Sequence, residues 1–337
     1  MVRGFQANKL KTRLLPKKDL SKGYQKLEAM MMSLVADSLS HEGSYVWGNI
    51  FAPCEILQCF DKRTLSIECL SCYFSGYHLE DYFIDCAQNA GLAPTLCSYH
   101  KTFTGAVESG VLKAPEYAVT TSLSCDGNLN TFRYLEKKIG VPFTFLDVPY
   151  DCDPESVDYL ADQLREMTKS LEKEHYYPGE IISQLYLMMG THLLMGTEEF
   201  RNLVNFMVKD IQTYPRFEGK RILWVHLLPF YQETLRSYFN GSRRYQVIAS
   251  DIVLDYANEL DASDPFRALA VKTIRNIYNG SYAYKAEALG QFAREVDADA
   301  VIHFCHWGCK QASGGSALLK EKMKEMGKKA MPEGKIG

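Results

Sequence analysis

The order of apolar and polar positions divides the chain into segments with two different periods. Apolar side chains recur at helical spacing over about residues 20–40, which predicts an amphipathic helix. From residue 45 onward, short β-prone runs alternate with helical stretches. The predicted strands are Tyr45–Phe51, Thr64–Ile67, Ala93–Leu96, Tyr117–Leu123 and Pro142–Val148, and the predicted helices include Glu80–Ala90 and Asn128–Ile139. This alternation predicts a parallel sheet with helices on its faces.

A second alternation follows a helical middle region. Asp153-Pro154-Glu155 is typical of a helix start, and a mostly helical region is predicted to extend to about Tyr214. Further strands are predicted at Arg221–Leu228, Tyr245–Ala249 and Ala300–Phe304, with one intervening helix starting at Asp264-Pro265. The sequence therefore predicts two similar α/β halves.

These elements give a predicted division into four parts. An N-terminal helical segment covers 1–44, a first α/β domain 45–152, a helical connection 153–218 and a second α/β domain 219–337. The residues after the predicted helix Leu318–Met326 contain no apolar strand pattern. The second domain is therefore expected to be incomplete at its C-terminal end.

The composition excludes several classes of protein. The 337 residues are 46% hydrophobic and 23% charged, which is typical of a soluble globular protein with a large core. A net charge of -3 gives no reason to expect nucleic acid or an anionic membrane as a partner. Residues 1–19 lack the apolar core of a secretory signal, and no apolar stretch is long enough to predict a membrane span. We expect a cytoplasmic protein that binds neither nucleic acid nor membrane.

Ten cysteines are the unusual feature of this composition. In a reducing cytosol they are not expected to form disulfides, and most such thiols are plain buried side chains. Three of them, however, follow predicted strands, where open parallel sheets bind ligands: Cys97, Cys125 and Cys309. Thiolates suit zinc or an iron–sulfur cluster, and structural zinc sites usually use close cysteine pairs. The scattered positions therefore favour a cubane cluster held between the two domains, with one iron left open.

Two further cysteine features leave alternatives open. Cys69-x-x-Cys72 has the spacing of a zinc half-site, a redox pair or extra cluster ligands, but a single pair favours ordinary burial. Cys305, four residues before Cys309, is the best candidate for an additional ligand.

Several of these motifs resemble those of one enzyme family. His303–Gln311, followed by Gly314-Gly315-Ser316, resembles the C-terminal cluster motif of the 2-hydroxyacyl-CoA dehydratase D-component family, which includes 2-hydroxyglutaryl-CoA dehydratase and benzoyl-CoA reductase-like subunits. Pro53-Cys54-Glu55 resembles its early Pro-x-Glu motif. The segments that start at Cys97 and Cys125 resemble its other cysteine motifs in order and spacing, so the likeness spans about 45–326.

This resemblance implies an α/β fold of two Rossmann-like (flavodoxin-like) parallel-sheet domains plus helical segments. It implies a [4Fe-4S] cluster on Cys97, Cys125 and Cys309 in the interdomain cleft, with a larger double-cubane cluster as the alternative. It also implies a related second subunit, in a heterodimer or homodimer, and an ATP-dependent iron–sulfur activator protein. The implied reaction is the anaerobic dehydration of an (R)-2-hydroxyacyl-CoA through a cluster-bound ketyl radical, so the implied enzyme is a lyase that acts on a CoA thioester.

Two residues are candidates for catalysis. Glu55 is the candidate for proton transfer or substrate positioning, because burial near a cluster would raise the pKa of its carboxyl group. The alternative is a surface glutamate at a helix start. His303 and His306 flank the cluster motif, and His306 is the candidate for a hydrogen bond to the substrate or to a cluster sulfur. At least one of these two histidines is expected to be a packed side chain.

Three other functions stay open at this point. A benzoyl-CoA-reductase-like or double-cubane-type ATP-dependent reductase would use the same fold and electron donor, and Cys305, Cys69 and Cys72 would supply thiols for a larger cluster. A non-catalytic iron–sulfur partner subunit would bind a cluster but turn over nothing. A zinc-stabilised binding protein would be colourless, so metal and sulfide analysis separates it from the others.

Overall fold

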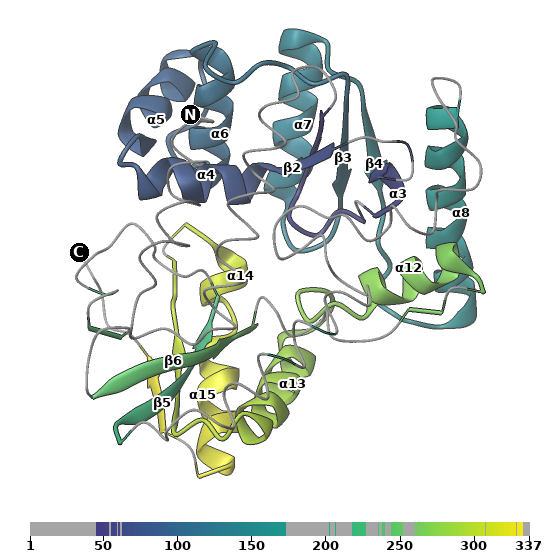
Figure 1. Ribbon diagram of the computed structural model, residues 1–337. Helices are drawn as coiled ribbons and strands as arrows, with labels where there is room; N and C mark the ends of the chain where they lie inside the picture. Colours follow the sequence, from purple (N-terminus) through teal and green to yellow (C-terminus); the bar gives the residue numbers. More distant parts are fainter. Residues whose placement is uncertain are drawn as a thin grey trace. The chain divides into compact units, whose positions relative to one another are not determined.

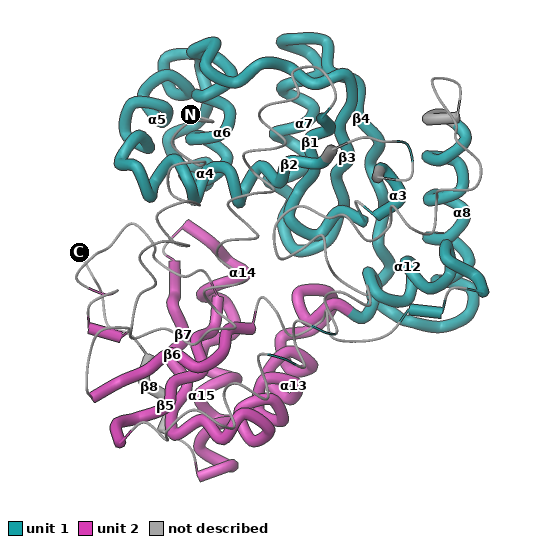
Figure 2. The backbone as a smooth tube through the Cα atoms, in the orientation of Figure 1, with its two compact units in different colours: residues 1–213, 256–275 teal, residues 214–255, 276–337 magenta. Residues whose placement is uncertain are grey.

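The computed structural model describes residues 45–53, 55–58, 60, 63–172, 202, 206, 218–226, 235, 238–239, 244–251, 260–261, 263–306, 308–327 and 329–332. These residues form two four-stranded parallel sheets with helices around them (Figure 1). The chain divides into two compact units (Figure 2): unit 1 comprises Met1–Thr213 and Tyr256–Arg275, and unit 2 comprises Tyr214–Asp255 and Asn276–Gly337. The expected α/β fold with two parallel-sheet domains is confirmed. The predicted helix over 20–40 and most of the helical region predicted after residue 172 lie outside the described residues.

The sheet of unit 1 has the strand order β2-β1-β3-β4, and all of its pairs are parallel. The central strand β1 is buried along its whole length, and its Trp47 packs edge-on against Phe103 with ring centroids 4.9 Å apart. The strands are β1 Tyr45–Gly48, β2 Arg63–Ser66, β3 Tyr117–Thr121 and β4 Phe143–Leu146. Four of the five strands predicted for this part of the chain are thus confirmed, three with shorter bounds and β2 shifted by one residue.

The fifth predicted strand, Ala93–Leu96, is wrong. These residues form a turn in which the Leu96 N–H donates to the Ala93 carbonyl at 3.0 Å. Pro94 has no N–H for a ladder, and its carbonyl accepts instead from the Lys101 Nζ at 2.8 Å. Cys97 therefore follows a turn that leads directly into a helix, rather than the end of a strand.

Seven helices are described in unit 1. They are α3 Glu55–Gln58, α4 Ile67–Gly76, α5 Glu80–Asn89, α6 Ser98–Glu108, α7 Asp126–Ile139, α8 Pro154–Glu172 and α12 Pro265–Ile274. Helices α5 and α6 pack closely because Gly105 has no side chain. A Cβ atom at Gly105 would lie 1.7 Å from the Phe83 carbonyl oxygen. Asp153 caps α8 as predicted, since its Oδ1 accepts from the Ser156 N–H at 2.8 Å.

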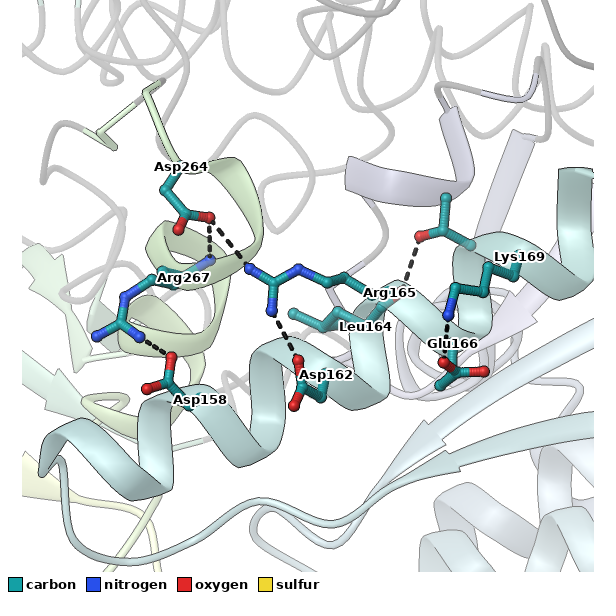
Figure 3. Close-up of polar contacts among 9 residues, drawn as sticks. Asp158, Asp162, Leu164, Arg165, Glu166, Lys169, Asp264 and Arg267 are labelled. Atoms are coloured by element: carbon teal, nitrogen blue, oxygen red, sulfur yellow. Dashed lines mark hydrogen bonds and ion pairs between the residues drawn. The ribbon is translucent and has the colours of Figure 1, made fainter.

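Helix α12 packs against α8 and belongs to unit 1, although the sequence-based division places it in the second domain. Its N-cap Asp264 accepts from the Arg267 N–H at 3.2 Å and lies 3.6 Å from the Arg165 guanidinium, while Arg267 pairs with Asp158 (Figure 3). These ion pairs are partly exposed and contribute little stability. The buried apolar side chains of both helices contribute most of it, and they include Val157, Leu160, Leu164, Leu269 and Ile274.

The sheet of unit 2 has the strand order β6-β5-β7-β8 and is also parallel throughout. Its core includes Trp224, which packs edge-on against Phe239 with ring centroids 5.3 Å apart. The described elements are β5 Lys220–Val225, β6 Tyr245–Ser250, α13 Tyr282–Glu295, β7 Ala300–His303, α14 Lys310–Ser313, α15 Ser316–Glu325 and β8 Lys329–Pro332.

The expectation that no strand follows Met326 is wrong. Strand β8 pairs in parallel with β7 over four residues, from Ala300↔Lys329 to His303↔Pro332. It lies at the edge of the described sheet, where lysine and proline are tolerated because only one side of the strand is paired. A short edge strand of this composition carries no apolar alternation, which explains why the sequence pattern did not reveal it.

The two sheets share one topology. In each, the first strand in sequence is flanked by the second strand on one side and the third on the other, and the fourth lies beyond the third. The chain therefore changes direction across the sheet between β1 and β3 in unit 1, and between β5 and β7 in unit 2. Ligands of doubly wound folds bind at this point, beyond the carboxyl ends of the strands. Among the described helices, none is long and apolar enough to cross a membrane.

Candidate functional site

In unit 1, two of the predicted ligand cysteines are the N-caps of neighbouring helices. Cys97 caps α6, and Cys125 caps α7, whose Gly127 N–H donates to the Cys125 Sγ at 3.3 Å. Helices α6 and α7 pack against each other. The N–H groups and the dipole at a helix N-terminus stabilise negative charge, so both positions suit a negatively charged ligand atom.

A buried histidine accompanies these cysteines. The Nδ1 of His100, which is one helical turn beyond Cys97, lies 2.9 Å from the Thr131 hydroxyl of α7. A Cβ atom on Gly127 would lie 3.1 Å from both the Cys125 Sγ and the His100 Nε2, so these two side chains flank Gly127. Burial lowers the pKa of His100 to about 4, so the imidazole is neutral at pH 7. We did not predict a role for His100, although its spacing after Cys97 was a signal.

The Cys69 and Cys72 pair has a different environment. Both residues lie on α4, and Cys69 is in its first turn. Desolvation raises the pKa of Cys69 to about 12 and that of Cys72 to about 11. Both thiols are therefore protonated at neutral pH, which favours the interpretation as packed side chains over that as ligands.

The predicted catalytic residue Glu55 is buried and paired. It is the first residue of α3, with 2% of its side chain exposed, and its Oε1 forms an ion pair with the Lys272 ammonium of α12. The side chain of Lys272 is 12% exposed. The ammonium group stabilises the ionised carboxylate and so opposes the effect of burial that we expected. Lys272 was not predicted as a partner of Glu55, because the two residues are 217 positions apart in the chain.

A second carboxylate in unit 1 fixes the loop after β1. Glu68, in the first turn of α4, accepts from the Ile50 N–H at 2.9 Å and from the Ser66 hydroxyl at 3.2 Å. Burial raises the pKa of Glu68 to about 7, because desolvation outweighs these hydrogen bonds. The first residue after β1, Asn49, donates from its amide to the Thr121 hydroxyl at 3.2 Å.

In unit 2, Asp251 organises a buried polar cluster at the carboxyl ends of β5 and β6. It follows β6 directly, and its Oδ1 accepts from the His226 N–H at 2.8 Å. Its Oδ2 accepts from the Tyr278 hydroxyl at 2.7 Å and lies 3.1 Å from the Lys285 ammonium. Lys285, with 1% of its side chain exposed, also lies over the Tyr278 ring, with its Nζ 3.5 Å from the centroid. No motif in the sequence marks this group of residues, because its members are scattered over four segments.

His303, at the end of β7, forms a chain of contacts with the cluster motif. Its Nε2 lies 3.1 Å from the Tyr282 hydroxyl, and its Nδ1 lies 3.7 Å from the Cys305 Sγ. Burial lowers the pKa of His303 to about 4. The Tyr282 ring lies where a Cβ atom of Gly315 would stand, 1.9 Å from the ring Cγ. Packing of the Tyr282 ring thus explains why residue 315 is a glycine. Contacts within unit 2 explain the position of the His303 side chain.

The remaining predicted residues of this motif lie in the loop after β7. Cys309 is the N-cap of the short helix α14, and its N–H donates to the His306 carbonyl at 3.0 Å. Burial lowers the pKa of His306, which favours the neutral imidazole. Trp307 and Cys54, which belong to the quoted motifs, lie outside the described residues.

The residues present fit an iron–sulfur cluster in their chemistry. Three cysteines lie at helix N-caps, and thiolates are the usual ligands of such clusters. Cys97 and Cys125 belong to unit 1, and Cys309 and Cys305 belong to unit 2. Across the described ranges, no three His, Cys, Asp or Glu side chains gather into a metal-binding group. Ligation by residues of both units therefore stays a prediction.

The comparison with protein families covers nearly all of the described chain. Residues 49–176 and 173–332 match the family described as 2-hydroxyglutaryl-CoA dehydratase, D-component. The chain belongs to this family. The resemblance stated from the motifs is thus confirmed, and the dehydratase-family match includes both units and all three cysteine motifs.

A curated relative agrees with this family. The alpha subunit of (R)-2-hydroxyisocaproyl-CoA dehydratase from Clostridioides difficile is 22% identical to the chain over 135 residues. The aligned stretch covers 37% of this chain and 33% of the relative. The match therefore spans about a third of the relative's length, and it supports the family rather than a particular substrate.

Proposed function

We propose that this chain is the iron–sulfur subunit of an acyl-CoA dehydratase that converts an (R)-2-hydroxyacyl-CoA into a 2-enoyl-CoA. Membership of the dehydratase family over both units is the observation that carries the proposal. The name of the curated relative supports a 2-hydroxyacyl thioester as the substrate class. The protein would act in the cytoplasm.

The proposed cluster ligands are Cys97, Cys125 and Cys309, with Cys305 as an additional candidate. The helix N-termini at Cys97 and Cys125 support the thiolate form that ligation needs. When bound, a [4Fe-4S] cluster supplies single electrons at low potential. The His100 imidazole, which lies beside Gly127 and Cys125, would exclude water from that side of the site.

The net reaction removes water and is redox-neutral. The bond between C2 and the hydroxyl oxygen breaks, a proton leaves C3, and the two groups depart as one water molecule. The proposed role of Glu55 is to accept the C3 proton, and the ion pair with Lys272 keeps its carboxylate ready for that transfer. His306 is the candidate for a hydrogen bond to the substrate near Cys309.

The proposed complex contains further proteins. The relative is an alpha subunit, which supports a related second subunit beside this chain. The electron would come from an ATP-dependent iron–sulfur activator protein. The acyl-CoA substrate would bind at the carboxyl ends of the strands, where both sheets change direction.

Turnover of defined thioesters tests this proposal. The chain, isolated anaerobically with the subunits bound to it, is supplied with ATP, reductant and activator. It is then assayed with (R)-2-hydroxyisocaproyl-CoA and (R)-2-hydroxyglutaryl-CoA. We expect enoyl-CoA from at least one of them. We also expect Glu55→Gln to lower turnover at least about 100-fold at unchanged iron content, whereas Glu136→Gln, on the exposed face of α7, changes it little.

Two outcomes would replace the proposal. Reduction of benzoyl-CoA without dehydration of either hydroxyacyl thioester would assign a reductase of the same family. A bound cluster whose absorption spectrum does not change with acyl-CoA, together with no turnover, would assign a non-catalytic partner subunit.

A further inference from the structure

His226 is a buried histidine whose ring packs against Tyr278, with ring centroids 6.1 Å apart, but whose ring nitrogens have no hydrogen-bond partner among the described residues. It is the first residue after β5 and is 7% exposed, yet neither Nδ1 nor Nε2 has a hydrogen-bond partner there. Its φ of 76° is an uncommon backbone conformation for a residue other than glycine. Buried polar groups are nearly always paired, so an unpaired ring at a strand end needs an explanation.

The neighbouring polar groups form no hydrogen bond with the His226 imidazole within the described residues. Asp251 accepts from the backbone N–H of His226 and from the Tyr278 hydroxyl, and it forms an ion pair with the Lys285 ammonium. Asn49, the residue at the same point of unit 1, donates from its Nδ2 to the Thr121 hydroxyl although its Oδ1 has no partner, whereas both nitrogens of the His226 ring lack a partner within the described residues. Asp251 thus fixes the backbone of His226 and leaves its imidazole available.

The charges around the ring determine which ligand it suits. Burial lowers the pKa of His226 to about 3, and the facing groups that act on it are Asp251, Lys285, His303 and His306. Asp251 and Lys285 form a buried ion pair, so the two charged side chains beside the ring neutralise each other. The site therefore offers one N–H donor and one nitrogen acceptor without net charge, which is complementary to a hydroxyl group.

We propose that His226 binds the 2-hydroxyl group of the acyl-CoA substrate by a hydrogen bond to its imidazole. This inference rests on the proposed function and identifies the residue that distinguishes a hydroxyacyl thioester from one that lacks the hydroxyl. The ring lies at the edge of unit 2 where β5 and β7 end and where the loop to Cys309 begins. An anionic group would bring an uncompensated charge into this buried cluster, so a neutral hydroxyl fits better.

Binding of a matched ligand pair to the full chain tests the inference. (R)-2-hydroxyisocaproyl-CoA and isocaproyl-CoA differ only in the hydroxyl, and calorimetric titration gives their two dissociation constants. We expect the wild-type protein to bind the hydroxyacyl thioester at least about 10-fold more tightly, because the unpaired imidazole is satisfied only by that ligand. In His226→Asn, which keeps a residue tolerant of positive φ but is too short to reach, the preference should fall below about 3-fold.

A matched control and a second variant separate recognition from packing. His78 is exposed, lies in unit 1 and has a φ of 56°, so His78→Asn should keep the wild-type preference. His226→Phe removes the unpaired nitrogens but keeps a ring. We expect it to melt at a higher temperature than wild type without ligand and to gain no more protection from the hydroxyacyl thioester than from isocaproyl-CoA.

The outcomes distinguish this inference from the function on which it rests. Tight binding of both thioesters by wild type without preference, or an unchanged preference in His226→Asn, would overturn the role of His226 and leave the proposed dehydratase intact. A wild-type protein that binds neither thioester would overturn the proposed function and this inference with it.

Discussion

Unit 1 and unit 2 place a carboxylate at the same point of the same topology and surround it with different groups. Glu68 follows β2 in unit 1 and accepts from the N–H of Ile50, just beyond β1. Asp251 follows β6 in unit 2 and accepts from the N–H of His226, just beyond β5. In each unit a carboxylate shortly after the second strand thus fixes the loop after the first strand.

The two carboxylates differ in charge compensation. Asp251 has the Lys285 ammonium at 3.1 Å and the Tyr278 hydroxyl at 2.7 Å. In the described part of unit 1, the groups that act on Glu68 are hydrogen-bond donors rather than cations, and burial raises its pKa to about 7. Asp251, in an ion pair with Lys285, therefore fixes the loop in unit 2. In unit 1 the loop is fixed by the Glu68 carboxyl group, whose pKa lies near 7. Substitutions at the two sites should accordingly have different effects.

The largest expected effect follows from breaking the buried pair of unit 2. Lys285→Met leaves the Asp251 carboxylate without its counter-ion in a fully buried position, which should cost about 3–5 kcal/mol of unfolding free energy. Urea unfolding followed by hydrogen exchange in the peptides of β5 and β6 measures this loss. The double variant Asp251→Asn/Lys285→Met should recover much of it, and a double variant as unstable as Lys285→Met would contradict a charge effect.

A smaller loss is expected from the ion pair of unit 1. Lys272→Met removes the ammonium that pairs with the Glu55 carboxylate, but the lysine side chain is 12% exposed and water can partly replace it. We expect a loss of about 2–3 kcal/mol from the hydrogen-exchange stability of β1 and β2. The exposed Lys137 of α7 provides the control, because Lys137→Met should change that stability by no more than about 0.5 kcal/mol. Equal losses of stability in Lys272→Met and Lys137→Met would refute a stabilising role of the Glu55–Lys272 ion pair.

The pH dependence of unit 1 should reveal the uncompensated carboxyl group. The pKa of Glu68 is about 7 in the folded protein against an ordinary 4.5, so folding favours the protonated form. The protonated Glu68 side chain contributes its full stabilisation below pH 4.5, and this contribution is lost as the pH rises to 7 and beyond. The loss is roughly 3 kcal/mol at most. Glu68→Gln, which keeps an acceptor for the Ile50 N–H, should remove this part of the pH profile. A variant profile parallel to that of wild type would contradict it.

The smallest expected effect concerns the glycine beneath Tyr282. Gly315→Ala places a Cβ atom 1.9 Å from the ring Cγ, so the ring must shift and its contact with His303 weakens. We expect a loss of about 1–2 kcal/mol from unit 2 in thermal unfolding. Gly308→Ala is the matched control, because its Cβ atom would meet nothing closer than 3.9 Å. A loss as large in Gly308→Ala would show that the loop, rather than the ring, is sensitive.

The sequence was sufficient for most strands, because buried parallel strands are short apolar runs between helical periods. It failed at Ala93–Leu96, whose apolar composition resembles a strand although Pro94 directs the chain into a turn. It also failed at β8, since an edge strand that contains lysine and proline has no apolar pattern. Both failures concern tertiary context, which local composition does not encode.

The candidate site was predictable only where chemistry and position coincide in the sequence. Positions after predicted strands marked Cys125 and Cys309, the wrongly predicted strand Ala93–Leu96 marked Cys97, and a motif marked Glu55. The groups that pair with such residues come from distant segments, as Lys272 does for Glu55. The Asp251 cluster was likewise invisible, because an aspartate, a lysine and a histidine on separate elements form no motif. Which charged side chains pair with one another is therefore decided by tertiary packing and not by local sequence.

The central proposal is that cysteines of both units hold one iron–sulfur cluster. Its most direct test is the iron and sulfide content of the anaerobically purified chain and of one cysteine variant in each unit, with folding checked by circular dichroism. We predict about four irons per chain, lost for the most part in both Cys125→Ser and Cys309→Ser but retained in Cys152→Ser, a partly exposed cysteine outside the motifs. Iron-free wild-type protein, or full iron content in folded Cys309→Ser, would contradict the claim.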